Sequence, residues 1–155
     1  MPAEAKPKVG IISCSGEEIA EGTVSRLATL RVLHELRPHE TVTLCLPLFL
    51  AGDGHEREFA RTHPTITVDG CDLRCAARGT EMYSAPPAAQ VVVSDVVARC
   101  GLVRPQGRRR LDEAGCRAVE ATAACVADLV DALMVRGTDA PAAGVPDVTP
   151  PAGTR

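Results

Sequence analysis

Four short runs of aliphatic and β-branched residues alternate along this chain with longer segments whose apolar residues have a helical spacing. The runs predict strands at residues 8–14, 41–46, 65–68 and 88–95. Helices are expected at residues 17–36, within 49–63, from 71 to 79, and at 111–136. Continuously apolar strands separated by helices are typical of parallel sheets. The sequence therefore predicts a three-layer α/β fold, with a mostly parallel four-stranded sheet and helices on both faces.

The length of 155 residues favours one domain with a single core. Only Phe49, Phe59 and Tyr83 are aromatic, so we expect the core to consist of Val, Leu, Ile and Ala. The predicted domain covers residues 1–136. Residues 137–155 are rich in Pro, Gly and Ala and are predicted to form a disordered tail.

Charge and hydropathy disfavour two classes of partner. The net charge is −3, and no stretch alternates basic with aromatic residues, so no nucleic-acid partner is expected. The one dense basic run, at residues 108–110, is interpreted as a solvated loop rather than an anion contact. No stretch is long and apolar enough to span a membrane, and the opening residues lack the apolar core of a signal peptide. A cytoplasmic location is therefore expected.

The cysteines are the side chains in this sequence that most directly predict a function. In a reducing compartment, seven cysteines indicate metal binding, catalysis or burial rather than disulfides. Cys14 and Cys45 lie near the carboxyl ends of the first two predicted strands, and Cys71 follows the third. Cys75 is four residues after Cys71, which places both on one face if that segment is helical. Because parallel strands end at a common edge, the four thiols are expected to converge there.

Four converging thiolates would suit a tetrahedral Zn²⁺ ion, although Cu(I), cadmium, mercury or an iron–sulfur cluster would also accept them. Helix N-termini at the same edge are expected to lower the pKa of these thiols. The three remaining cysteines are expected to be buried in the core: Cys100, Cys116 and Cys125.

Two further groups of residues have structural interpretations. Asp53 and the charged residues after it are interpreted as a glycine-hinged loop that enters a solvated helix, although His55 could act as an additional ligand or proton donor. Asp69 is expected to accept hydrogen bonds from the following amides. Gly70 and Gly16 are expected to supply unusual backbone conformations.

Three cysteine-bearing segments together resemble the DGC-domain family, which is named for an Asp-Gly-Cys motif. The segments are Val68-Asp69-Gly70-Cys71 with Cys75, Ser13-Cys14-Ser15-Gly16, and Cys45-Leu46-Pro47, and the likeness runs from about Val9 to Asp95. The resemblance implies a zinc-binding protein with four chelating residues, Cys14, Cys45, Cys71 and Cys75. It implies no particular reaction.

Three functional hypotheses follow from the sequence. The first is a zinc-binding protein in which the site is structural or serves metal storage or transfer. The second is a thiol oxidoreductase or a sulfur- or selenium-handling enzyme, with a reactive thiolate at Cys71 or Cys14. The third is an iron–sulfur protein that uses the same four ligands.

Overall fold

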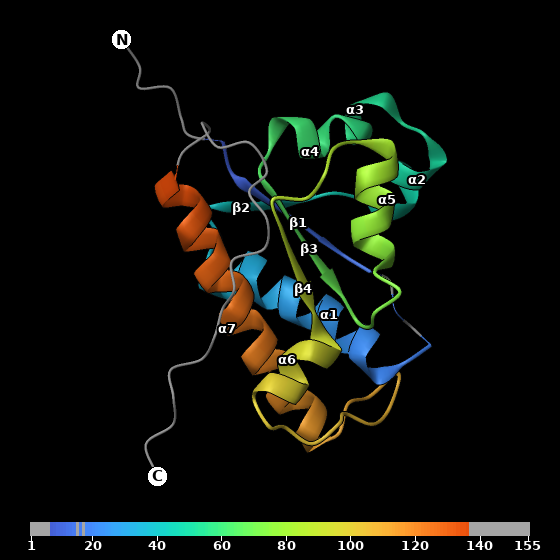
Figure 1. Ribbon diagram of the computed structural model, residues 1–155, viewed down its shortest axis with the longest axis vertical. Helices are drawn as coiled ribbons and strands as arrows, with labels where there is room; N and C mark the ends of the chain where they lie inside the picture. Colours follow the sequence, from blue (N-terminus) through green and yellow to red (C-terminus); the bar gives the residue numbers. More distant parts are fainter. Residues whose placement is uncertain (1–6, 15, 17, 137–155) are drawn as a thin grey trace.

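One four-stranded parallel sheet forms the centre of the molecule (Figure 1). A computed structural model describes residues 7–14, 16 and 18–136. The strands lie in the order β2-β1-β3-β4, with the bounds β1 (Val9–Ser13), β2 (Thr41–Thr43), β3 (Thr65–Asp69) and β4 (Ala89–Val92). Gly10 of the inner strand β1 pairs with Val42 on one side and with Thr65 on the other. The predicted parallel sheet is confirmed.

Helices cover both faces of this sheet, as predicted. Three helices lie on the first face: α1 (Ala20–Arg31), α6 (Val93–Arg99) and α7 (Glu113–Arg136). A π-helical turn, η1 (Val32–Leu36), continues α1. On the second face, towards the upper right of Figure 1, the chain forms α2 (Leu46–Ala51), α3 (Gly54–Arg57), α4 (Phe59–Thr62) and α5 (Cys75–Tyr83).

Side chains of β1 alternate between two cores, as the pleat of a strand requires. Val9 and Ile11 belong to the larger core, which α1, α6 and α7 share. Ile12 and Cys14 belong to a smaller core on the opposite face, where they pack with Phe59. Most fully buried side chains are Val, Ile or Ala, as predicted. The leucines also expected in the core are at most partly buried among the described residues. Cys14, just beyond the end of β1, thus packs with residues of α4 and α5 at the edge of the sheet.

Two predicted strands are shorter than expected because a helix begins inside each apolar run. The strand predicted at 41–46 ends at Thr43, and α2 begins at Leu46 with Pro47 in its first turn, where proline is favoured. The strand predicted at 88–95 ends at Val92, and α6 begins at the next residue. Buried valines in α6 follow helical rather than strand spacing: Val93, Val96 and Val97.

The predicted helix at 17–36 begins later and buries a different face than its apolar spacing indicates. It begins at Ala20, and Glu17 lies outside the described residues. Leu27 and Leu30 are both exposed. Smaller residues face the core instead: Val24, Ala28 and Val32. These short side chains allow α1 to lie close to the sheet and to α7.

The predicted tail at residues 137–155 lies outside the described residues, so its disorder stays a prediction. None of the helices that the structure describes has the length and apolarity needed to cross a membrane.

Candidate metal centre

Three cysteines follow the carboxyl ends of three adjacent strands. Cys45 comes two residues after β2, Cys14 directly after β1, and Cys71 two residues after β3. Because β1 lies between β2 and β3, the three chain segments leave the sheet next to one another. Cys75 is the first residue of α5, which the chain enters from the same edge. We call the four residues the edge cysteines: Cys14, Cys45, Cys71 and Cys75.

Cys14 is the buried member of this set, with 9% of its surface exposed. The amide of Gly70 donates a hydrogen bond to its Sγ atom at 3.3 Å. The hydroxyl oxygen of Ser25, in α1, lies 3.2 Å from the same sulfur. Because Ser25 gives its only hydroxyl proton to the carbonyl of Gly22 (2.7 Å), the protonated Cys14 thiol is the donor to Ser25. Sequence reasoning missed Ser25, which no local motif links to Cys14.

Burial raises the pKa of the Cys14 thiol above its ordinary value. The hydrogen bond that the Gly70 amide donates to the sulfur opposes this rise, while the negative charges of Asp69 and Cys75 add to it. The expected lowering of this pKa by a helix N-terminus is therefore wrong for Cys14, because desolvation exceeds the stabilisation of the thiolate. Without a bound cation, Cys14 is a thiol at neutral pH.

Asp69 fixes the start of α5 from a distance. The residue just before α5 is Arg74, which has a left-handed backbone (φ 50°) and provides no side-chain cap. The Asp69 carboxylate instead accepts hydrogen bonds from the amides of Ala76 (2.7 Å) and Ala77 (3.1 Å). The predicted capping role of Asp69 is thus confirmed. Burial raises the pKa of this carboxyl group, although both amide hydrogen bonds oppose the rise.

The helix predicted from residue 71 begins only at Cys75, because residues 71–74 form a turn. Cys71 and Cys75 therefore do not share a helix face as expected. They lie instead on the two sides of a short turn. Asp69, just before this turn, accepts hydrogen bonds from amides in the first turn of α5. Cys71 keeps its predicted place beyond the carboxyl end of β3.

Three glycines bring α1 close to this edge. A Cβ atom at Gly70 would lie 2.7 Å from the backbone nitrogen of Gly22 and 2.8 Å from its Cα. Gly16 and Gly22 also touch backbone to backbone, and Gly16 has a positive φ of 41°. The unusual conformation predicted for Gly16 is confirmed. Gly70 does not have a positive φ, so its expected role is wrong, and close approach is what requires glycine there.

The edge cysteines follow adjacent strands of the sheet, but their side chains are not gathered into a complete set of metal ligands. Cys14 and Cys75 are close enough for their charges to interact. Cys45 and Cys75 are exposed, and Cys71 is half-buried. Among the residues that the structure describes, no three or more His, Cys, Asp or Glu side chains are grouped closely enough to hold a metal ion.

The other cysteines differ from expectation. Cys100 and Cys116 are exposed, so their predicted burial in the core is wrong. Cys100 follows the last residue of α6, and Cys116 is an exposed residue in the first turn of α7. Cys125 is half-buried against the larger core. Burial raises the pKa of its thiol, with partial opposition from Arg99.

The charged loop around Asp53 has the structural role that its sequence favours. The Asp53 carboxylate accepts hydrogen bonds from the amides of His55 (3.0 Å) and Glu56 (3.1 Å), and so caps α3. His55 is exposed and belongs to no described group of potential metal ligands.

Fold and edge together define a class: a parallel three-layer α/β protein whose cysteines follow adjacent strand ends. Residues 10–126 of the chain match the family model of the DGC domain. The chain therefore belongs to the DGC domain family. The match includes all four edge cysteines and extends into α7, beyond the predicted limit near Asp95. Membership supports a metal-binding role for the protein. No curated protein and no solved structure gives a significant match.

Proposed function

We propose that this protein binds one Zn²⁺ ion through the thiolates of Cys14, Cys45, Cys71 and Cys75. The observation that carries the proposal is the position of three of these residues after three adjacent parallel strands. The crevice outside the carboxyl ends of such strands is where ligands bind in open α/β sheets.

The residues present fit a soft cation. Sulfur donors favour Zn²⁺ over hard ions such as Mg²⁺ and Ca²⁺. The Gly70 amide already donates to the Cys14 sulfur, and this is the kind of contact that supports a ligating thiolate. Cys45 and Cys75 are exposed and so not confined by packing. Their side chains can therefore change rotamer to complete a ligand set.

A site with four protein ligands would be closed, and catalytic zinc requires an open position. We therefore infer a structural, storage or transfer role rather than catalysis. When bound, the ion would supply positive charge that offsets the thiolates and the nearby Asp69 carboxylate. All seven cysteines, each of which is described, are free. This is compatible with the proposed cytoplasmic location.

Two other functions use the same residues. A thiol enzyme that depends on Cys14 is disfavoured, because this sulfur is buried and its pKa is raised. A thiol enzyme based on Cys71 would bind no stoichiometric metal. An iron–sulfur protein would absorb visible light.

The test is elemental analysis, with a visible absorption spectrum, of protein purified without a metal-affinity tag. We expect about one zinc per chain and no colour. Cys71→Ser should lose most of the zinc, whereas Cys116→Ser, which changes an exposed cysteine in α7, should keep it. Metal-free protein with a fast-reacting Cys71 would establish the thiol enzyme instead, and brown protein the cluster. Equal zinc loss in both variants would overturn the ligand assignment.

A further inference from the structure

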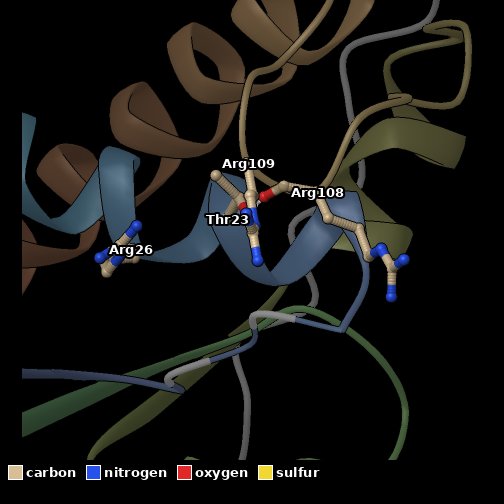
Figure 2. Close-up of a pocket in the computed structure, with 4 residues that line it drawn as sticks. All are labelled: Thr23, Arg26, Arg108 and Arg109. Atoms are coloured by element: carbon tan, nitrogen blue, oxygen red, sulfur yellow. Dashed lines mark hydrogen bonds between the residues drawn. The ribbon is translucent and has the colours of Figure 1, made fainter.

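A cavity of about 710 Å³ lies between the first half of α1 and the segment that joins α6 to α7 (Figure 2). Its lining residues are Thr23, Arg26, Arg108 and Arg109. Arg108 and Arg109 belong to the basic run for which the sequence favours a solvated loop, and both are exposed. No edge cysteine lines this cavity, so it is separate from the proposed metal site.

The joining segment is fixed to α1 and α7 by several contacts. The Thr23 hydroxyl donates to the carbonyl of Arg108. The buried carboxylate of Glu21 pairs with Arg104 at 2.7 Å. At the far end, Asp112 accepts hydrogen bonds from the amides of Gln106 (3.2 Å) and Gly115 (2.8 Å). The cavity wall is therefore held by tertiary contacts rather than formed by a free loop.

The lining carries positive charge without a described counterion. Elsewhere on the described surface, five arginines pair with carboxylates: Arg31, Arg37, Arg61, Arg104 and Arg117. Within the described residues, none of the three lining arginines forms such a pair, and no acidic residue is part of the lining. In a chain with a net charge of −3, the cavity is thus a local site of positive potential.

The arrangement of the arginines indicates what kind of anion would fit. In Figure 2, Arg26 and Arg108 lie on opposite sides of Thr23, and Arg109 lies between them. Charges spread in this way match several anionic groups better than one. A volume of about 710 Å³ is within the usual range for small-molecule sites, which is roughly 300–1,000 Å³. Guanidinium groups bind phosphoryl oxygens in a bidentate manner.

We propose that this cavity binds a small organic molecule that carries two or more linked phosphoryl groups. Arg26 and Arg108 contact separate phosphoryl groups, and Arg109 contacts the bridge between them. The joining segment contributes two of the three cations, so the site requires α1 and this segment to be held together as described.

The experiment measures the binding of inorganic tripolyphosphate to the full chain by calorimetry, with inorganic phosphate and citrate as comparison probes. We expect tripolyphosphate to bind at physiological salt and both comparison probes to bind at least about tenfold more weakly. Arg108→Gln combined with Arg109→Gln should weaken tripolyphosphate binding about tenfold or more, and Arg26→Gln should weaken it also. Arg110→Gln is the matched control, because Arg110 belongs to the same basic run but does not line the cavity.

Melting temperatures of all variants establish that each is folded. Since polyphosphates also chelate zinc, the metal content is measured before and after titration. The double variant, which keeps every cysteine but lacks two of the lining arginines, supplies the correction for chelation. Equal weakening by Arg110→Gln and by the double variant would show nonspecific charge attraction and overturn the site. Equal affinity for phosphate or citrate would overturn the linked phosphoryl assignment. Absence of tripolyphosphate binding to the unmodified chain would also overturn it.

Discussion

Asp69, Gly70 and Cys71 are consecutive, yet each has a separate role at the carboxyl edge of the sheet. Asp69 accepts hydrogen bonds from the amides of Ala76 and Ala77 in the first turn of α5. Gly70 allows α1 to approach and gives its own amide to the Cys14 sulfur. Cys71 provides a sulfur beyond the strand end. The motif is therefore a compact structural unit in which only the third residue is a candidate ligand.

Gly70→Ala should destabilise the protein by about 1–3 kcal/mol, because the new methyl group would overlap the backbone of Gly22, which cannot rotate away. Gly79→Ala is the matched control. A methyl group there would meet only a Leu50 side-chain carbon at 3.7 Å. Inside α5, alanine should stabilise the protein by about 0.5–1 kcal/mol. Denaturant unfolding measures both, and equal effects of the two substitutions would contradict the close approach at Gly70.

Alkylation of the cysteines should follow their burial and their role as ligands. After chelation, we expect Cys45 and Cys75 to react fast, while Cys14 reacts slowly because it is buried and protonated. Addition of zinc should then protect the exposed edge cysteines. Cys100 and Cys116 are exposed in the same protein and should react equally with or without zinc. Peptide mapping identifies each site.

Protection of Cys100 or Cys116 by zinc would mean that the ion binds elsewhere. Unchanged labelling of Cys45 would remove that residue from the ligand set. Both outcomes can be read from a single experiment, because the exposed cysteines outside the edge are internal standards.

At the scale of elements, the first turn of α5 depends on a carboxylate that belongs to β3. Asp69→Ala should cost about 1–3 kcal/mol of folding free energy, since it leaves buried helix amides without an acceptor. Asp69→Asn should cost less, because the amide oxygen can still accept one of these bonds. The Asp53→Ala variant, which removes an exposed cap from α3, should cost less than Asp69→Ala. Denaturant unfolding compares all three, and a larger loss in Asp53→Ala would contradict this role.

The end of η1 is joined to α7 by a bidentate ion pair. Arg37 donates to both carboxylate oxygens of Asp131, at 2.7 and 2.6 Å. The hydrogen bond from Arg37 lowers the pKa of the Asp131 carboxyl group. The folded state binds this proton less readily than the unfolded state does. The ion pair therefore stabilises the folded protein above the unfolded pKa of roughly 4, and this stabilisation is lost as the pH falls through the lower folded pKa.

Thermal unfolding should therefore show a small loss of stability as the pH falls from 6 to 2. Asp131→Asn should make this loss smaller. Arg37→Gln should reduce it equally, because the shift requires both partners. An unchanged pH profile in either variant would show that the ion pair does not contribute.

Helices and strands whose apolar residues keep one spacing throughout could be predicted from the sequence. Apolar runs that contain a strand followed by a helix could not be divided correctly. The strand at 65–68 and the helix at 111–136 each keep one period, and both were predicted to within two residues. The run that contains β4 and α6 holds both periods, and the helical spacing of Val93, Val96 and Val97 identifies the second element only once burial is known. Asp69 could be predicted to accept hydrogen bonds from following amides, but not that these amides are those of Ala76 and Ala77, because residues 71–74 form a turn before α5.

For the whole molecule, the proposed ligands join three separate strands, so metal binding should be coupled to folding. Structural zinc contributes about 10–16 kcal/mol of apparent binding free energy in small peptides. An unliganded domain of this size has only about 0.05–0.15 kcal/mol of stability per residue. A strong chelator should thus lower the melting temperature by about 10 °C or more. Cys71→Ser should show a low melting temperature that chelation does not change, while Cys116→Ser should behave like the unmodified chain. Complete zinc removal with no change in melting would contradict this coupling.

The general location of the site could be predicted from the sequence, because parallel topology places strand ends at one edge. The contacts around Cys14 could not. Ser25 and Gly22 reach this edge only because α1 packs closely on the sheet, and this packing depends on the tertiary fold. For the same reason, the raised pKa of Cys14 follows from burial that strand position alone does not reveal.

The contact among Gly16, Gly22 and Gly70 also has an evolutionary consequence. These residues come from three separate segments, and a side chain on one would occupy space that the backbone of another fills. Selection should therefore act on the three positions as a single character. Relatives should keep all three glycines or lose them jointly, together with a displacement of the helix that follows the first strand. A sequence alignment of the family would then distinguish members that keep this contact among three glycines from members in which the helix is displaced.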